Sequence, residues 1–142
     1  MANVLAFAEQ RGGELRRAAL EAVTAARCVA DATGGEVHAV VCRKPEAGGA
    51  DAIVARLVAH GADVVLVCED AGFENYSPES IAATVAARIK NGGYRAAFFV
   101  SSAQGRDLAP RVAAKLQSPL ASDVTEFSVG ADSVSVKHPG YT

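Results

Sequence analysis

One stretch of the sequence combines small polar residues, a glycine and a basic residue in a pattern that suits anion binding. It lies between the apolar run 96–100 and the amphipathic segment 106–117. Hydroxyls and backbone N–H groups at the start of a helix attract phosphate, and an arginine there adds positive charge. The candidate anion-binding residues are Ser101, Ser102, Gly105 and Arg106.

The same stretch has a structural interpretation, which its charge favours. Asp107 is a candidate N-cap, and Pro110 is tolerated in the first turn of a helix that starts at Arg106. The Asp107 carboxylate would also repel a phosphate at the mouth of the loop. Under this interpretation the polar residues turn the chain and start the helix without binding a ligand.

The elements that would position this loop alternate along the chain. Four apolar runs predict strands buried on both faces, and a helical spacing of apolar residues follows each run. The predicted strands are 3–9, 36–42, 62–68 and 96–100, and the predicted helices are 14–33, 50–60, 78–91 and 106–117. Right-handed crossovers between such units give a parallel sheet with helices on both faces. Ligands bind such sheets at the carboxyl ends of the strands.

We therefore expect a single α/β domain over residues 1–142, with three layers and an adenine-nucleotide-hydrolase-like or Rossmann-like fold. Glycine pairs at 34–35 and 92–93 predict helix ends, because glycine readily adopts the left-handed conformation. Ser77 followed by Pro78 predicts a helix start, with the serine as N-cap.

The pattern changes after Pro119. Two limbs, 124–129 and 134–137, surround a Gly-Ala-Asp sequence at 130–132. The second limb alternates between apolar and polar residues, which is typical of a half-exposed antiparallel strand. The sequence therefore predicts a C-terminal antiparallel hairpin after the parallel sheet.

Composition argues against several classes of function. The chain has a net charge of −2 and a pI near 5.9, so nothing electrostatic favours nucleic acid or an anionic membrane. Aromatic residues make up only 6% of the chain, too few for base-stacking platforms. The amino terminus lacks the basic region of a signal peptide, and no apolar stretch approaches the roughly 20 residues that span a bilayer. We expect a soluble, cytoplasmic protein.

The three cysteines and three histidines lack catalytic or metal-binding spacing. Cys28, Cys42 and Cys68 include no CxxC pair, so we expect inert, buried thiols in a reducing compartment. The histidines fall in a predicted strand, at a predicted helix end and in the terminal turn, where we expect structural roles. They are His38, His60 and His138. We therefore expect no metal site and no catalytic residue.

An acidic loop follows the third predicted strand. Its carboxylates are Glu69, Asp70 and Glu74, and Phe73 and Tyr76 are interleaved with them. A solvated loop is the simpler interpretation. The sharper one is a loop that docks a partner protein, because loops on a rigid scaffold often carry binding residues. Charge reversal at the three carboxylates would then weaken partner binding and leave folding intact.

Common nucleotide-binding and hydrolase motifs are missing. The sequence has no GxxxxGK[ST] phosphate loop, no GxGxxG after the first strand and no GxSxG nucleophile elbow. Gly12 and Gly13 lack the serine and aspartate of the SGGxDS loop of ATP pyrophosphatases. The sequence thus shows no active site.

Three blocks of sequence resemble the α subunit of electron transfer flavoproteins. The first is VLAFAEQRGGELRRAALEAVTAAR, an apolar strand ending in a glutamate, then a glycine turn and a helix. The second and most specific is GRDLAPRVAAKLQSPLASDVTEF, similar to the family's G-[KR]-[DN]-L-x-P-R-V-A-A-x-L…SDV segment. The third is VKHPGYT, which resembles the R-P-x-Y-A-G-N-A turn, with Lys137 and His138 replacing its arginine-type start. The resemblance covers essentially the whole chain.

This resemblance implies a role in electron transfer. The family's α subunit pairs with a β subunit that can bind AMP. The carboxy-terminal domain of the α subunit holds most of the FAD. The complex carries electrons from flavin dehydrogenases, such as the acyl-CoA dehydrogenases of fatty acid β-oxidation, to a membrane quinone oxidoreductase. The chain resembles the amino-terminal domain only, and the family's FAD-contacting motifs lie beyond Thr142. The resemblance therefore implies a non-catalytic scaffold that docks the β subunit.

Two alternatives belong to other classes of protein. A free-standing AMP- or ATP-binding module similar to universal stress proteins would use residues 101–106 on phosphate. That family's loop has several glycines, however, and here only Gly105 is present. The second alternative is an ATP-dependent ligase or pyrophosphatase, but the sequence lacks the nucleotide-binding loop of such enzymes. Binding of AMP or ATP by the domain alone would favour the first alternative.

Overall fold

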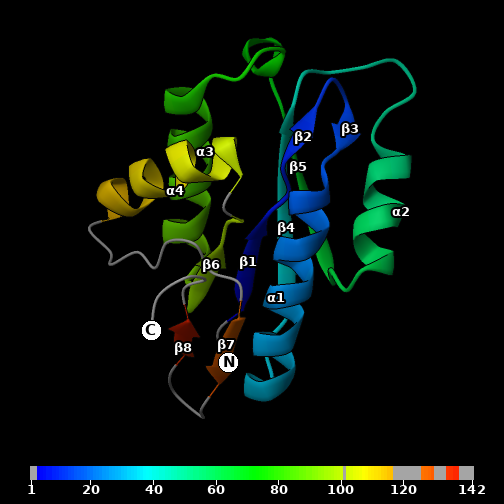
Figure 1. Cartoon of the computed structure of the whole chain (residues 1–142). Coiled ribbons are helices and arrows are strands. Elements are labelled where there is room, and N and C mark those ends of the chain that lie inside the picture. Colours follow the sequence, from blue (N-terminus) through cyan, green and yellow to red (C-terminus); the bar gives the residue numbers. More distant parts are fainter. Residues whose placement is uncertain (1–2, 101, 117–125, 130–133, 138–142) are drawn as a thin grey trace.

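The computed structural model describes residues 3–100, 102–116, 126–129 and 134–137. The strands are β1 (Val4–Phe7), β2 (Gln10–Arg11), β3 (Glu14–Leu15), β4 (Val37–Arg43), β5 (Val64–Glu69), β6 (Ala96–Phe98), β7 (Glu126–Val129) and β8 (Val134–Lys137). The helices are α1 (Arg17–Thr33), α2 (Asp51–Ala59), α3 (Pro78–Gly92), α4 (Ala103–Leu116) and the 3-10 helix η1 (Ala71–Phe73). Figure 1 shows their arrangement.

The main sheet is parallel, and its strand order is β5-β4-β1-β6. β1 pairs with β4 on one side and with β6 on the other. β5 pairs with β4 in a register that places Cys42 directly opposite Cys68. Within the described residues, β6 therefore lies at an edge of the sheet, and β1 and β4 lie inside it.

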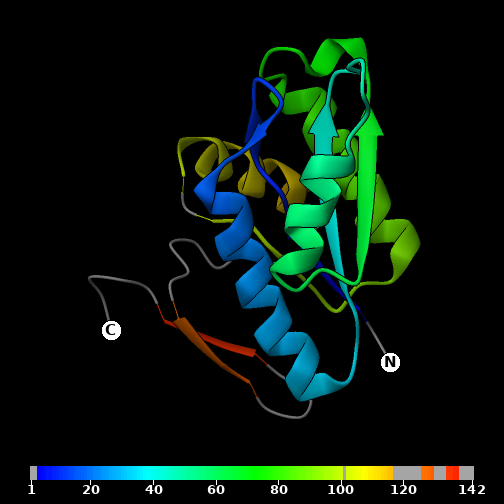
Figure 2. The ribbon, with the colours of Figure 1, turned by 90° about the vertical axis from the view of Figure 1, so that its right-hand side faces the viewer.

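Helices cover both faces of this sheet, which confirms the predicted three-layer α/β fold (Figures 1 and 2). α1 and α2 pack on one face, in an apolar group that we call the α1-face cluster; it includes Val4, Ala6, Ala22, Val23, Ala26, Val37, Ile53, Leu57 and Phe98. α3 and α4 pack on the other face, in the α3-face cluster; it includes Leu5, Phe7, Val40, Cys42, Phe73, Ile81, Val85, Leu108 and Val112.

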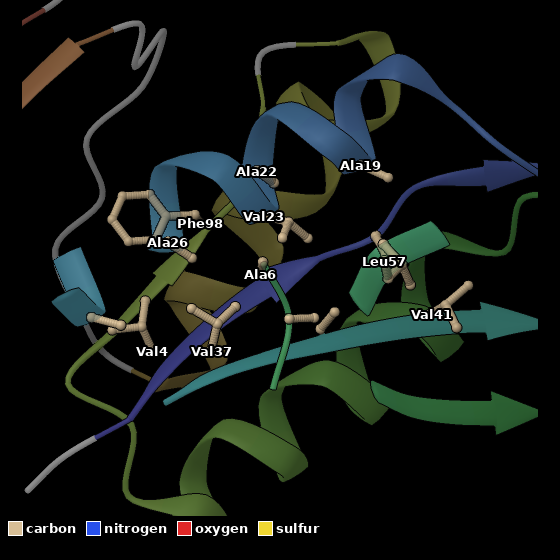
Figure 3. Packing of buried hydrophobic residues seen from close by; sticks show 14 of the residues in the cluster. Val4, Ala6, Ala19, Ala22, Val23, Ala26, Val37, Val41, Leu57 and Phe98 are labelled. Carbon is tan, nitrogen blue, oxygen red and sulfur yellow. The ribbon is translucent and has the colours of Figure 1, made fainter. Parts of the chain in front are cut away.

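The residues of β1 show how one strand serves both layers. Successive side chains of a strand point to opposite faces, and Val4 and Ala6 join the α1-face cluster whereas Leu5 and Phe7 join the α3-face cluster. All four residues are buried. The continuous apolar run is therefore what a strand covered on both faces requires. In Figure 3, small side chains of α1 lie against Val4, Ala6 and Val37.

Helix α1 starts three residues after its predicted start. Glu14 and Leu15 form β3, which pairs with β2, and α1 begins at Arg17. Gly12 and Gly13 have φ angles of 61° and 85°, the left-handed conformations that a two-residue hairpin turn needs. The prediction that this segment is a simple turn into a helix is therefore wrong at its first three residues.

Helix α4 starts three residues before its predicted start, at Ala103. The hydroxyl of Ser102 accepts a hydrogen bond of 3.0 Å from the backbone N–H of Gly105, as an N-cap does. The prediction that Asp107 caps this helix is therefore wrong, because Asp107 lies inside it. Pro110 also lies inside the helix and not in its first turn, where it removes one intrahelical donor.

The predicted ends of α1 and α3 agree with the structure, and the predicted end of the fourth helix at residue 117 lies outside the described residues. Gly34 and Gly93 are C-caps in the left-handed conformation, with φ angles of 84° and 64°. α3 begins at Pro78, directly after Ser77. The Ser77 hydroxyl does not cap α3, however, and donates instead to the carbonyl of Gly72 at 2.9 Å.

The predicted C-terminal hairpin is confirmed in its two strands. β7 and β8 pair antiparallel, with Phe127 opposite Val136. The predicted turn at 130–132 lies outside the described residues. Figures 1 and 2 show the hairpin toward the end of the molecule at which the parallel strands begin, away from η1.

Candidate functional site

A cavity of about 630 Å³ opens where β1 and β4 end and α4 begins. This is the edge at which parallel α/β sheets bind ligands. Its charged lining consists of Glu9, Arg11, Arg16, Glu74 and Asp107. Its remaining lining consists of Phe7, Gln10, Gly12, Cys42, Phe73, Asn75, Tyr76, Ile81, Ser102, Ala103 and Gln104. Carboxylates thus outnumber guanidinium groups around the cavity.

Glu9 is the buried carboxylate of this site, with only 7% of its surface exposed. The Ser102 hydroxyl donates to Glu9 Oε1 at 2.5 Å, and Arg16 Nε lies 3.9 Å from Glu9 Oε2. A hydroxyl that the sequence offers to an anion therefore donates to a carboxylate of the protein. The same contact joins the end of β1 to the start of α4.

The four anion-binding candidates do not converge on one point. Ser102 and Gly105 lie together, since the Gly105 N–H donates to the Ser102 hydroxyl. Gly105 packs so closely that a Cβ would lie 1.9 Å from the carbonyl oxygen of Val100. Arg106 is exposed and is absent from the cavity lining. Ser101 lies outside the described residues.

A network of charged side chains lies beside the cavity. The Tyr76 hydroxyl donates to Asp107 Oδ2 at 2.9 Å, and Arg111 Nε donates to Asp107 Oδ1 at 3.1 Å. Arg111 also donates to Glu79 of α3, and Lys115 Nζ lies 3.5 Å from Glu79 Oε2. These contacts tie α4 to α3 and to the loop before it.

The network shifts the pKa values of its members in the directions that its hydrogen bonds require. Donation by Tyr76, and then by Arg111, holds the pKa of Asp107 below its usual range. Burial raises the pKa of Tyr76, and its hydrogen bond with Asp107 raises it further. Arg111 and Lys115 lower the pKa of Glu79. At neutral pH the carboxylates are therefore ionised and the phenol is neutral.

Arg43 is a second buried charge, at the carboxyl end of β4, with 2% of its surface exposed. Its Nε lies 3.2 Å from Glu69 Oε2, and its Nη2 lies 3.9 Å from Glu46 Oε2. Nη1 donates to the carbonyl of Gly49 at 3.3 Å. Among the described residues, Nη2 has no hydrogen-bond partner. Glu69 therefore holds a structural ion pair with a buried guanidinium.

The rest of the acidic loop is also engaged within the chain. Asp70 Oδ1 accepts a hydrogen bond from the Gly72 N–H at 2.7 Å and so caps η1. Glu74 Oε1 lies 3.1 Å from Lys44 Nζ, and the Glu74 side chain is 63% exposed. Phe73 is buried in the α3-face cluster. Only Glu74 combines an exposed charge with an exposed partner.

Sequence reasoning did not assign roles to Glu9 and Arg43. Each is a charged residue at or just after the end of an apolar strand, and that position is the signal that was available. A buried charge needs a partner, and the partners, Ser102 and Glu69, are distant in sequence. The pairs therefore emerge only from the tertiary structure.

The cysteines differ in burial. Cys42 is buried, Cys68 is partly buried and Cys28 is exposed on α1. The expectation that all three thiols are buried is therefore confirmed for Cys42, wrong for Cys28 and only partly met by Cys68. That position falls on the outer side of α1, because its neighbours Ala26 and Val29 face the sheet.

The histidines have hydrogen-bond partners within the chain. His38 Nδ1 lies 2.7 Å from the Tyr94 hydroxyl, and its Nε2 lies 3.2 Å from Glu36 Oε1. His60 follows α2, and its Nδ1 lies 2.9 Å from the carbonyl of Arg56. His138 lies outside the described residues.

The residues around the cavity do not fit the diphosphate of FAD or the phosphate of a nucleotide. The first strand leads into the β2–β3 hairpin, where a dinucleotide fold has a glycine-rich turn into a helix. Ser102 caps α4 and donates to Glu9, so the helix start is already engaged. The Asp107 carboxylate also lines this opening. Anion binding would have to overcome these charges.

The described part of the chain also contains no cluster of three or more metal-ligating side chains. In the same residues, no helix has both the length and the apolar character needed to cross a membrane.

Comparison with known proteins gives one consistent family. Residues 4–142 match the family described as the electron transfer flavoprotein domain. The chain is 37% identical over 131 residues to an electron transfer flavoprotein subunit alpha of Syntrophomonas wolfei, an alignment that covers 92% of this chain and 39% of that protein. It is 32% identical over 140 residues to the Bacillus subtilis subunit alpha, covering 99% of this chain and 41% of that protein.

A eukaryotic relative gives the same result. A probable mitochondrial subunit alpha of Caenorhabditis elegans is 39% identical over 127 residues, covering 87% of this chain and 35% of that protein. The chain thus spans about two-fifths of the length of the curated relatives that it matches. The chain belongs to the electron transfer flavoprotein family, and within that family it corresponds to the amino-terminal domain of the α subunit.

Proposed function

We propose that this chain acts as a non-catalytic scaffold in a heterodimeric electron transfer flavoprotein and packs against a β subunit. The family match over residues 4–142 carries the proposal. Its relatives are named as α subunits, and the chain accounts for about two-fifths of their length. In this proposal, FAD is held by the part of the α subunit that the chain does not match.

The cavity supports a scaffold role. Glu9, Glu74 and Asp107 place three carboxylates around it, and the hydroxyl of Ser102 is engaged by one of them. A site built for FAD or AMP would present donors to the phosphate oxygens. In the proposed complex, AMP therefore belongs to the β subunit, and this domain forms one folded unit over residues 1–142.

The proposed complex lies in the cytoplasm and carries electrons from flavin dehydrogenases, for example acyl-CoA dehydrogenases of fatty acid β-oxidation, to a membrane quinone oxidoreductase. Electrons would pass through the flavin, and this chain would supply no covalent or acid–base residue. Its contribution would be to hold the subunits in place while the flavin-bearing part meets its partners.

The acidic loop is the proposed docking element, and the structure directs attention to Glu74. Its side chain is 63% exposed, and Lys44 is its partner. Glu69 is unsuitable for a charge-reversal test, since its reversal would leave the buried Arg43 beside a cation. Asp70 caps η1, so its reversal would disturb the loop itself.

The test is coexpression of the chain with the β subunit from its own source, followed by size-exclusion chromatography. We expect coelution in equal amounts, with no flavin absorbance in the chain when it is purified alone. Separate elution of two folded proteins would contradict the proposal. Glu74→Lys should slow association with a partner about tenfold in low salt if the loop docks it. Glu21→Lys, an exposed reversal on α1, is the matched control.

The nucleotide-binding alternative rests on the cavity at the strand ends. Isothermal titration calorimetry of the chain with AMP and with ATP distinguishes the scaffold function from nucleotide binding. We expect no binding at millimolar nucleotide. Micromolar binding that is lost in Ser102→Ala would instead support a free-standing nucleotide module.

A further inference from the structure

Cys42 and Cys68 lie directly opposite each other on neighbouring parallel strands. β4 and β5 pair with these two residues in register, and both side chains belong to the α3-face cluster. The proximity of the two thiols shifts the pKa of both. The fold thus brings two sulfur atoms from separate βα units into one dithiol.

The backbone spacing suits a bond between these sulfur atoms. Neighbouring strands lie about 4.8 Å apart, and disulfide-bonded cysteines usually have Cα atoms about 4.4–6.8 Å apart. Because the two residues share a face and a register position, no strand has to slip before the sulfur atoms meet. Cys28, the remaining cysteine, lies on α1, which covers the opposite face.

The two thiols are not equivalent. Cys68 is partly exposed, whereas Cys42 is only 3% exposed. Hydrogen bonding from Cys42 lowers the pKa of Cys68 to about 7, and the charge of Arg88 on α3 lowers it further against the effect of burial. Hydrogen bonding to Cys68 and burial both raise the pKa of Cys42. Cys68 is therefore the thiol that is both accessible and readily ionised.

We propose that Cys42 and Cys68 form a modification site for low-molecular-weight disulfides such as oxidised glutathione. The Cys68 thiolate attacks one sulfur of the reagent, forms a mixed disulfide and releases one glutathione thiolate. The Cys42 thiol then gives up its proton and attacks the Cys68 sulfur, which releases the second glutathione. The protein loses two protons and two electrons, which together are two hydrogen atoms, and one oxidised glutathione becomes two reduced molecules.

Both cysteines lie within this domain, so the flavin and the proposed β subunit need not supply a residue to the site. The Cys42–Cys68 disulfide would join β4 to β5 beneath α3. It would lie beside the cavity, because Cys42 is one of the lining residues. Exposed Cys28 has no thiol on its face of the sheet, so its reaction should stop at the mixed disulfide. The reaction of Cys28 therefore serves as an internal control for the reaction of the Cys42–Cys68 pair.

The test treats the full chain, with any subunit that copurifies, with oxidised glutathione and follows it by intact-mass and peptide mass spectrometry. The background variant is Cys28→Ser, which leaves only the proposed pair. We expect the background protein to lose two hydrogen atoms and to yield a linked Cys42–Cys68 peptide. Adding Cys42→Ala should make the glutathione adduct on Cys68 accumulate, and adding Cys68→Ser should abolish both products.

Two outcomes would overturn the proposal. In one, the background protein keeps a glutathione adduct on Cys68 and never forms the linked peptide. In the other, neither cysteine reacts under conditions that fully modify Cys28 in the wild-type chain. Circular dichroism of each variant shows that it is folded, and Cys42→Ser replaces Cys42→Ala if the smaller side chain prevents folding.

Discussion

Helices α1 and α4 cover opposite faces of the same sheet and are held by different kinds of contact (Figure 1). α1 contacts β1, β4 and β6, and its sheet-facing residues are small or aliphatic; they are Ala19, Ala22, Val23, Ala26, Val29 and Ala30. α4 packs mainly on α3, and its buried residues are Gly105, Leu108, Ala109 and Val112.

The polar contacts of the two helices differ as well. α4 begins at a serine bonded to the buried Glu9 and carries a charged network with Tyr76 and Glu79. α1 is tied to the segment before β5 through Arg27, which contacts Asp63 at 2.7 Å and donates to the Gly61 carbonyl at 3.0 Å. The lesson is that α1 is positioned by many small apolar contacts, whereas α4 depends on a close approach at one glycine and on ionised side chains. Four measurements test this difference.

The largest effect is expected from removing bulk beneath α1. Phe98→Ala should lower the free energy of unfolding by about 4 kcal/mol, because the ring is 8% exposed and its loss leaves a cavity in the α1-face cluster. Chemical denaturation measures this loss. Phe98→Leu is the control, with a smaller expected loss. A loss below about 1 kcal/mol would show that α1 moves to fill the cavity. The apolar contacts of α1 would then hold the helix less rigidly than we infer.

A slightly smaller effect is expected at the single close contact of α4. Gly105→Ala should lower the free energy of unfolding by about 3 kcal/mol, because the new Cβ would lie 1.9 Å from the backbone oxygen of Val100. Hydrogen exchange should show faster exchange in α4 than in α1. Ala103→Ser, at an exposed position of the same helix turn, should change neither quantity. Equal loosening of both helices would contradict the comparison.

The Tyr76 hydroxyl, which belongs to the charged network of α4, should contribute modestly to the free energy of unfolding. Tyr76→Phe removes the donor to Asp107 and should cost about 0.5 kcal/mol, since the tyrosine is partly exposed. Thr24→Val removes an exposed hydroxyl bonded to Leu20 on α1 and serves as the control. Denaturation of both variants under one set of conditions compares the helices. A larger loss from Thr24→Val would place the more important polar contact on α1.

The smallest effect is a dependence of stability on acid pH. The pKa values of Glu79 and Asp107 are lowered in the folded state, so their contribution is complete above their unfolded pKa values of about 4. It is lost as the pH falls through the folded pKa values. The protection factors of the α4 amides, which correct for the slower intrinsic exchange in acid, should therefore fall at low pH more than those of the α1 amides do.

The double variant Glu79→Gln/Asp107→Asn should flatten that acid dependence and leave α1 unchanged. Asp63 is the control group, since its pKa is also lowered, by the Val37 N–H and then by Arg27, and it supports the α1 side. If Asp63→Asn flattened the response of α4 instead, the network at α4 would not be its source.

Much of the fold was predictable because the signals are local. The apolar run of β1 indicates burial on both faces, and the structure buries all of its residues. Gly34 and Gly93 mark helix ends because a left-handed residue ends a helix whatever lies nearby. The blocks that resemble the electron transfer flavoprotein family led to the family that the comparisons then showed.

The helix starts were less predictable, because competing local structures decide them. Gly12 and Gly13 favour a hairpin turn as well as a loop, and the hairpin removed the first residues from the predicted helix α1. At α4, the sequence predicted Asp107 as the cap, five residues after Ser102. The serine caps the helix in the structure, and its hydroxyl also meets Glu9 from a distant part of the chain.

The sequence by itself therefore determined the alternation of strands and helices, their ends at glycine and the family. Only the tertiary structure decided which distant side chains meet. Glu9 with Ser102, Arg43 with Glu69 and Cys42 with Cys68 are pairs set by strand register and helix placement. Local propensity acts over a few residues, whereas register depends on the packing of whole layers, so these pairs could not be read from spacing along the chain.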